Sequence, residues 1–149
     1  MEKADLVFTT SKSIVSAAIK FRTHGIWSHV MLATGEGDDV ISADAYGVIL
    51  RAMEPDEKEN YACLFCPGIS VEAQAIIKLA ASKIGKGYDF LGLASFLVDS
   101  DLNNEDRWFC SELVYMVYAA AGIQLLERIE HAFVSPRDLW ISPVLRRRF

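Results

Sequence analysis

The chain has 149 residues, of which 52% are hydrophobic and 23% are charged, so its composition is that of a globular protein rather than a disordered one. This length suits one domain with a substantial core, and we expect residues 1–149 to form a single domain. The net charge of −5 argues against nucleic acid as a partner, because proteins that bind nucleic acid usually carry a basic face.

The N-terminal segment MEKADLVFTT does not contain the cationic stretch and long apolar core of a signal peptide. The longest apolar run, FLGLASFLV, is far shorter than the roughly 18–20 residues that span a membrane. Three cysteines in a chain without an export signal favour reduced thiols over a disulfide framework. The sequence therefore predicts a protein that is cytoplasmic as synthesised and has no integral membrane segment. It leaves later delivery elsewhere and the oligomeric state open.

The first half of the chain predicts mainly strands, with one helix over residues 11–23 that Ser11 could cap. The turn sequence GEGDD joins two of the strands into a hairpin, and Gly47 allows another turn before VILRAM. The strands are expected at residues 5–10, 27–34, 40–45 and 61–66.

The second half predicts helices. One is expected to start at Ser70 and end at Gly85, and another to begin around Cys110 and end at Gly122. Residues 88–98 and 135–140 also look helical, residues 103–108 look like a loop, and the basic run 146–148 looks like a solvated tail. Strands followed by helices indicate an α+β fold rather than a parallel sheet.

Cys110 is the first candidate for chemistry. Backbone N–H groups at a helix start have no intrahelical partner and carry the positive end of the helix dipole. A thiolate at this position is stabilised, and the same N–H groups can receive the oxyanion that forms when a carbonyl is attacked. The alternative is that Cys110 is simply a small buried side chain.

His29 is the candidate base, because it lies in the apolar strand segment SHVML, where a polar side chain needs a partner. A third group should accept the other ring N–H of the imidazole. Ser42 and Asp44 are two apart on the following strand and point to one face. Asp44 is the stronger acceptor, but only the hairpin register decides whether either side chain reaches His29.

Cys63 and Cys66 form a C-x-x-C pair on a predicted strand. A zinc site needs about four ligands, and no second C-x-x-C or H-x-x-x-H pair is present. A thioredoxin-like motif would open a helix. We therefore expect two buried strand cysteines, and neither a metal nor a cofactor.

Four segments together resemble a known family: DLVF, WSHVMLATGEGDDVISADAYGVI, GYDFLGL and FCSELVYMVYAAAG. They are similar to the permuted branch of the NlpC/P60 papain-like cysteine hydrolases, in particular the YiiX/YebB-like group. The permuted order places the histidine before the cysteine, as also occurs in the lecithin:retinol acyltransferase-like group. The resemblance extends from Asp5 to about Trp140 and implies a circularly permuted papain-like fold.

The resemblance implies that Cys110 is the nucleophile and His29 the base. The third polar residue of the family falls on Ser42, which is uncharged, so Asp44 remains an alternative, as does a dyad without a third residue. Tyr88 lies in a segment shared with the family and is a candidate substrate contact. The rim of the active cleft would be formed by Trp27, Tyr46 and Trp108.

The family implies acyl transfer, and we expect hydrolysis of amide bonds in peptides or peptidoglycan fragments. One alternative is a thiol acyltransferase or phospholipase that acts on lipid acyl groups, although no hydrophobic terminal anchor is present. Another is a non-catalytic binding module that keeps the fold, which the uncharged Ser42 leaves open.

Overall fold

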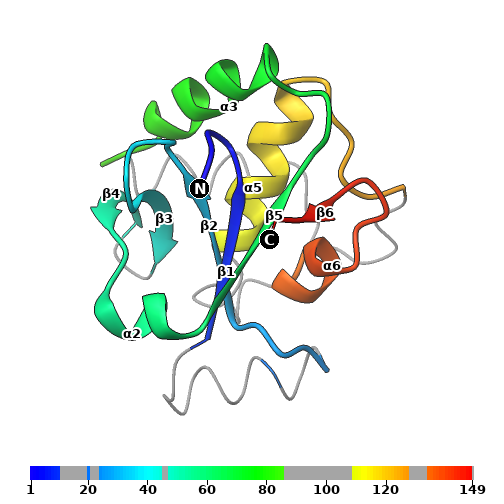
Figure 1. Cartoon of the computed structure of the whole chain (residues 1–149). Coiled ribbons are helices and arrows are strands. Elements are labelled where there is room, and N and C mark those ends of the chain that lie inside the picture. Colours follow the sequence, from blue (N-terminus) through cyan, green and yellow to red (C-terminus); the bar gives the residue numbers. More distant parts are fainter. Residues whose placement is uncertain (11–19, 21–23, 45–46, 86–108, 128–133, 149) are drawn as a thin grey trace.

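The computed structural model describes residues 1–10, 20, 24–44, 47–85, 109–127 and 134–148. Their main feature is a six-stranded sheet packed against helices (Figure 1), which is the predicted α+β arrangement. The strands are β1 (Leu6–Thr9), β2 (His29–Ala33), β3 (Asp39–Asp44), β4 (Gly47–Ala52), β5 (Tyr61–Phe65) and β6 (Arg146–Arg147). The helices are α2 (Pro55–Glu59), α3 (Glu72–Ala81), α5 (Phe109–Ala120) and α6 (Pro136–Trp140).

All neighbouring strands are antiparallel, in the order β4-β3-β2-β1-β5-β6. The first four strands form a meander, in which β2 and β3 are the predicted hairpin. Its register pairs Leu32 with Ile41 and Ala33 with Val40. Since opposite residues of a pair share a face, this register determines which side chains of β3 lie beside those of β2.

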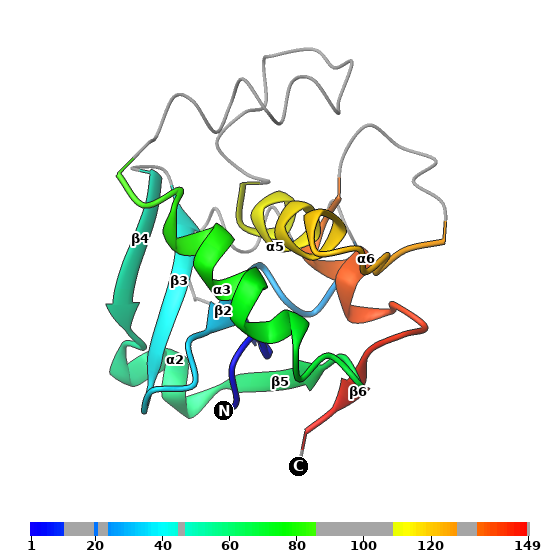
Figure 2. The ribbon, with the colours of Figure 1, turned by 90° about the horizontal axis from the view of Figure 1, so that it is seen from above.

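The two faces of the sheet bury different clusters of apolar side chains, as the alternation of residues along a strand requires. Figure 2 shows the sheet curving around α3, α5 and α6, which cover the face with the larger cluster. That cluster includes Leu6, Phe8, Val30, Leu32 and Ile41 of the sheet and Ile76, Val114, Val117 and Leu139 of the helices. The smaller cluster contains Val7, Met31, Ala33, Val40 and Met53.

Two of the predicted helix ends are confirmed. Ser135 caps α6: its Oγ accepts the Asp138 N–H at 3.2 Å, and the Asp138 carboxylate accepts the Ser135 N–H at 2.8 Å. α5 ends at Ala120, and Gly122 follows with φ +83°, a conformation that favours glycine.

The helix predicted over residues 70–85 is shorter than expected. Its N-cap is Val71 rather than Ser70, and no side chain caps it. After Ala81 the N–H groups of Lys83 and Ile84 bond carbonyls three residues back, at 3.0 and 3.1 Å, so the α-helix gives way to turns. Gly85 does not end the α-helix itself, and its N–H donates to Val48 O of β4 at 3.2 Å.

α2 was not predicted, although its sequence has a proline in the first turn and a capping box between Glu54 and Glu57. Apart from Lys20, the expected helices over 11–23 and 88–98 and the loop 103–108 lie outside the described residues. Among the helices that the structure describes, none combines the length and the apolar character needed to cross a membrane.

The basic run 146–148 was predicted to be a solvated tail; the side chains of Arg146 and Arg147 are exposed, but the segment is part of the sheet. Arg146 and Arg147 form β6, whose register with β5 pairs Arg147 with Leu64 and Arg146 with Phe65. The Arg148 Nε lies 2.7 Å from Oδ2 of Asp5, which is buried. Strand pairing uses the backbone, so exposed arginine side chains do not prevent this segment from joining the sheet.

Candidate active site

Cys110 is the second residue of α5, which packs against β2 and β3. Its side chain belongs to the larger core cluster and is 5% exposed. The first N–H groups of a helix have no intrahelical partner, and the positive end of the helix dipole lies there. The thiol is therefore buried at a place that favours negative charge.

His29 is the first residue of β2 and is half-buried, while Ser42 lies on the neighbouring strand β3 and is fully buried. The His29 Nε2 and Ser42 Oγ atoms are 2.8 Å apart. Because Ser42 occupies Nε2, Nδ1 is the ring nitrogen that remains for a second partner. The neighbouring strand β3 thus supplies one of the two candidate orienting residues to the histidine.

Cys110 and His29 shift each other's pKa. Burial opposes the thiolate, but the charge of His29 and a hydrogen bond with its ring outweigh burial, and the pKa of Cys110 falls below its ordinary value. Hydrogen bonds from the backbone N–H groups of Val30 and Ser111 act in the same direction. Burial also opposes the imidazolium, yet the charge of Cys110 and the same hydrogen bond raise the pKa of His29. The pair therefore favours thiolate and imidazolium.

Of the remaining predicted site residues, Trp27 is the one whose side chain the structure describes. Trp27 was expected at the rim of the cleft, but it is 8% exposed and belongs to the core. Its ring lies 5.4 Å from that of Trp140 and 6.5 Å from that of Phe8, so aromatic packing explains its position. Asp44 ends β3 opposite Gly47, and its side chain is outside the described part of the chain. Tyr46, Tyr88 and Trp108 also lie outside the described part of the chain.

The two residues after Cys110 play different parts. The Ser111 hydroxyl donates to the Val134 carbonyl at 2.6 Å, so it anchors the start of α5 to the segment before α6. Glu112 lies in the first turn, and burial raises its pKa to about 7. At neutral pH Glu112 is therefore only partly ionised.

Sequence reasoning missed two charged residues that act on His29. Arg51 of β4 and Glu57 of α2 form an ion pair, and both charges act on the histidine. The signal for α2 was present as the Glu54 to Glu57 capping box after a strand. Nothing in the sequence alone relates that helix to His29, because the contact depends on how β4 lies beside β3.

Cys63 and Cys66 are buried free thiols, as predicted, but Cys66 lies just after β5 rather than on a strand. Cys63 lies on β5, and its Sγ is 3.4 Å from the Asp5 carboxylate. Burial and the negative charge of Asp5 raise the pKa of Cys63 to about 12. Its surroundings therefore oppose the reactive thiolate form.

Comparisons with known proteins identify a family that covers most of the chain. The family model Peptidase_C92, described as permuted papain-like amidase enzyme, YaeF/YiiX, C92 family, matches residues 1–140. The uncharacterized protein YiiX of Escherichia coli (strain K12) is 28% identical over 135 residues, a match that covers 85% of this chain. The chain spans 62% of the length of that curated relative.

A solved structure, the metalloprotein YiiX from Escherichia coli O157:H7, superposes with a TM-score of 0.72 at 25% identity, covering 99% of this chain and 96% of that one. Within the described ranges of the present chain, no three His, Cys, Asp or Glu side chains are grouped to hold a metal ion. The family match covers most of the sequence and confirms the resemblance to permuted papain-like enzymes. The chain therefore belongs to the Peptidase_C92 family of permuted papain-like amidase enzymes.

Proposed function

We propose that this protein is a cysteine hydrolase of amide bonds, with Cys110 as nucleophile and His29 as general base, and that peptides, including those of peptidoglycan, are its substrates. The observation that supports this most directly is the site itself: a thiol at a helix start faces a histidine whose Nε2 is held by Ser42. Membership of an amidase family supports the same reaction class.

The reaction would begin with the thiolate of Cys110 and the imidazolium of His29. The sulfur attacks the carbonyl carbon of the amide, and the carbonyl oxygen takes up the negative charge. N–H groups at the start of α5 stabilise that oxyanion. His29 then donates its proton to the leaving amine as the C–N bond breaks, which leaves an acyl-enzyme. Water, deprotonated by His29, attacks the acyl-enzyme; the C–S bond breaks, the acid leaves, and the thiolate and imidazolium are restored.

Ser42 would orient the imidazole in this scheme. When His29 donates Nε2–H to Ser42 Oγ, the tautomer places the basic nitrogen at Nδ1, the nitrogen that remains for Cys110. A serine fixes the ring without adding a negative charge, so the charge that stabilises the imidazolium in this pair is mainly that of the thiolate.

A direct test is to incubate the protein with a set of muropeptides and other peptide amides, and separately with phospholipids, and to identify the products by mass spectrometry. Cys110→Ala should abolish amide cleavage, whereas the matched Cys66→Ala variant should keep it. Release of fatty acid from phospholipid without amide cleavage would show a lipid-directed enzyme. No turnover of either class, together with retained binding of peptides, would indicate a binding module.

The role of Ser42 is tested by comparing two variants on β3. Ser42→Ala should lower kcat/KM for amide cleavage about tenfold, because one hydrogen bond to the catalytic imidazole is lost. Asp44→Asn should have the smaller effect. A larger loss of kcat/KM in Asp44→Asn than in Ser42→Ala would indicate that Asp44 is the residue that orients the imidazole.

A further inference from the structure

The ion pair between Arg51 and Glu57 is unusually well fixed for a pair close to the surface. The two side chains make a bidentate contact, with both N–O distances at 2.7 Å. Their side chains are 22% and 14% exposed, so most of the contact is shielded from water. Such a pair is screened less by salt than a fully exposed one.

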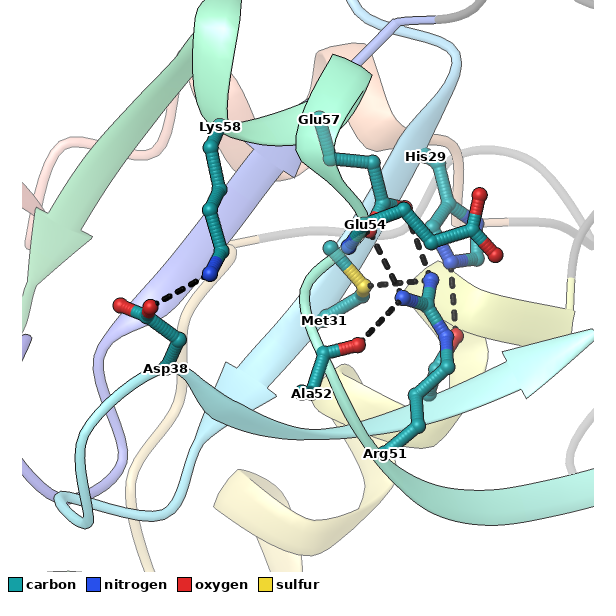
Figure 3. A network of polar contacts seen from close by, with 9 residues as sticks. His29, Met31, Asp38, Arg51, Ala52, Glu54, Glu57 and Lys58 are labelled. Carbon is teal, nitrogen blue, oxygen red and sulfur yellow. Dashed lines mark hydrogen bonds and ion pairs between the residues drawn. The ribbon is translucent and has the colours of Figure 1, made fainter.

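Both partners are also tied to the backbone (Figure 3). Glu57 accepts the N–H of Glu54 at 2.8 Å, and the Arg51 guanidinium donates to the Ala52 carbonyl at 3.1 Å. A second guanidinium nitrogen lies 3.3 Å from Sδ of Met31. The corner between β4 and α2 therefore holds both charges in place against β2.

That position lies beside His29. Met31 is two residues along β2 from His29, so both side chains leave the same face of the strand. Arg51 of β4 is the register partner of Val40 of β3. Val40 is two residues from Ser42, so these three residues share a face of the sheet. In the view of Figure 3 the Arg51 guanidinium, the Glu57 carboxylate and the carboxylate of the exposed Glu54 all lie beside the His29 ring. The ion pair thus flanks the histidine on the face where it meets Ser42.

The two charges act on His29 in opposite directions. The positive charge of Arg51 lowers the pKa of His29, and the negative charge of Glu57 raises it. Glu57 is ionised at neutral pH: burial opposes its charge, but hydrogen bonds from Arg51 and the Glu54 N–H lower its pKa. Within the described chain, the charged and titratable groups that act on His29 are these two and Cys110 of α5.

We propose that Arg51 and Glu57 are a positioning pair for the catalytic histidine, whose two fixed charges set how readily His29 carries the proton in its pair with Cys110. The inference rests on the proposed function of His29 and Cys110. It also explains how an uncharged Ser42 can serve as the orienting residue. The carboxylate near the histidine belongs to Glu57 of α2, is paired with Arg51, and need not lie on β3.

Removing the charge of Arg51 and removing the charge of Glu57 should shift the titration midpoint of His29 in opposite directions. Glu57→Gln removes the negative charge that raises the pKa of His29 and keeps the positive charge of Arg51, so the His29 titration midpoint should fall by about half to one pH unit. In Arg51→Gln the charge of Glu57 remains, and the midpoint should rise. In the double variant it should return close to that of the unmodified protein. Arg51→Lys, which keeps the charge, should change it least.

The midpoint is measured by NMR titration of the full chain labelled at the histidine ring carbons. His29 is assigned among the three histidines by its absence in His29→Gln. Asp38→Asn is the matched control. It breaks the exposed ion pair, 2.6 Å long, between Asp38 of the β2–β3 turn and Lys58 of the same helix α2, and it should leave the midpoint unchanged.

Shifts in the same direction for both single variants, or none, would overturn the proposal and assign the ion pair a purely structural role. The readout needs no substrate, so the two proposals can fail separately. Opposite shifts in a protein without amidase activity would support the positioning pair and reject the proposed function. Amidase activity that depends on Cys110, together with an unchanged His29 midpoint in both single variants, would support the proposed function and reject the positioning pair.

Discussion

Cys63 and Cys110 are both buried thiols in one small protein, yet their surroundings shift their pKa in opposite directions. Burial penalises the thiolate in both. Cys63 faces the Asp5 carboxylate, which adds to the penalty and helps bring its pKa to about 12. Cys110 faces His29 and two backbone N–H groups, which more than offset the penalty. The sign of the neighbouring charge, rather than burial, distinguishes the thiol whose pKa is lowered from the thiol whose pKa is raised.

The largest test of this contrast removes the positive partner. In His29→Ala only the backbone N–H groups remain to oppose burial, so Cys110 should be almost entirely protonated at neutral pH. We expect its alkylation by iodoacetamide at pH 7 to slow by about a hundredfold or more. The rate is followed by mass spectrometry of the Cys110 peptide. His24→Ala, at an exposed residue, is the control, and an unchanged rate in His29→Ala would show that the histidine does not activate the thiol.

The next test acts on the other cysteine. Arg148→Met leaves the buried Asp5 carboxylate without its cation, and breaking such a pair should lower the free energy of unfolding by about 2–4 kcal/mol. It also removes a positive charge that lowers the pKa of Cys63, so this thiol should become still less reactive. Urea unfolding measures the first effect and alkylation the second.

Glu2→Gln is the matched control for Arg148→Met, because Glu2 contacts the same guanidinium but is 74% exposed. We expect it to cost less than about 1 kcal/mol. Equal losses in the two variants would mean that the burial of Asp5 is not what makes its ion pair important.

Glu112 tests burial without an opposite charge. Burial raises the pKa of Glu112 to about 7, so between about pH 4.3 and 7 the folded state keeps a proton that the unfolded state has lost. Its contribution to stability therefore falls as the pH rises through this window. Glu112→Gln should unfold with similar free energy near pH 4 but be more stable by about 1–2 kcal/mol near pH 8, after allowance for partial exposure. Urea titrations at both pH values decide; equal stability near pH 8 contradicts the raised pKa.

The same comparison shows how far sequence can reach. The start of α5, the β2–β3 hairpin and the Ser135 cap follow from residues close in the chain, so local pattern predicts them. The charged residue that faces each cysteine cannot be predicted in this way. Asp5 lies 58 residues from Cys63, and Arg148 lies 143 residues from Asp5. Such contacts depend on strand order, which no local pattern specifies.

Strand register alone does not identify the residue that holds His29. Continued from Leu32–Ile41 and Ala33–Val40, the register would set Ser42 opposite Met31 and Asp44 opposite His29. The Ser42 hydroxyl nevertheless lies 2.8 Å from Nε2 of His29, so the contact depends on how the side chains are directed as well as on the pairing. The prediction that Trp27 lies at the rim of the cleft failed for a related reason. A tryptophan just before a strand fits either a cleft rim or the core, and its packing against Phe8 and Trp140 joins residues far apart in the sequence.

The smallest expected effect separates the side chain of Ser111 from its backbone. Ser111→Ala removes the hydroxyl that donates to the Val134 carbonyl and should lower the free energy of unfolding by about 1 kcal/mol. The N–H that hydrogen-bonds the Cys110 sulfur is unchanged, so the pH dependence of Cys110 alkylation should stay the same. If that profile moved toward higher pH, the hydroxyl would be holding the helix start in place, and Cys110 would owe its reactivity to the Val134 anchor as well as to His29.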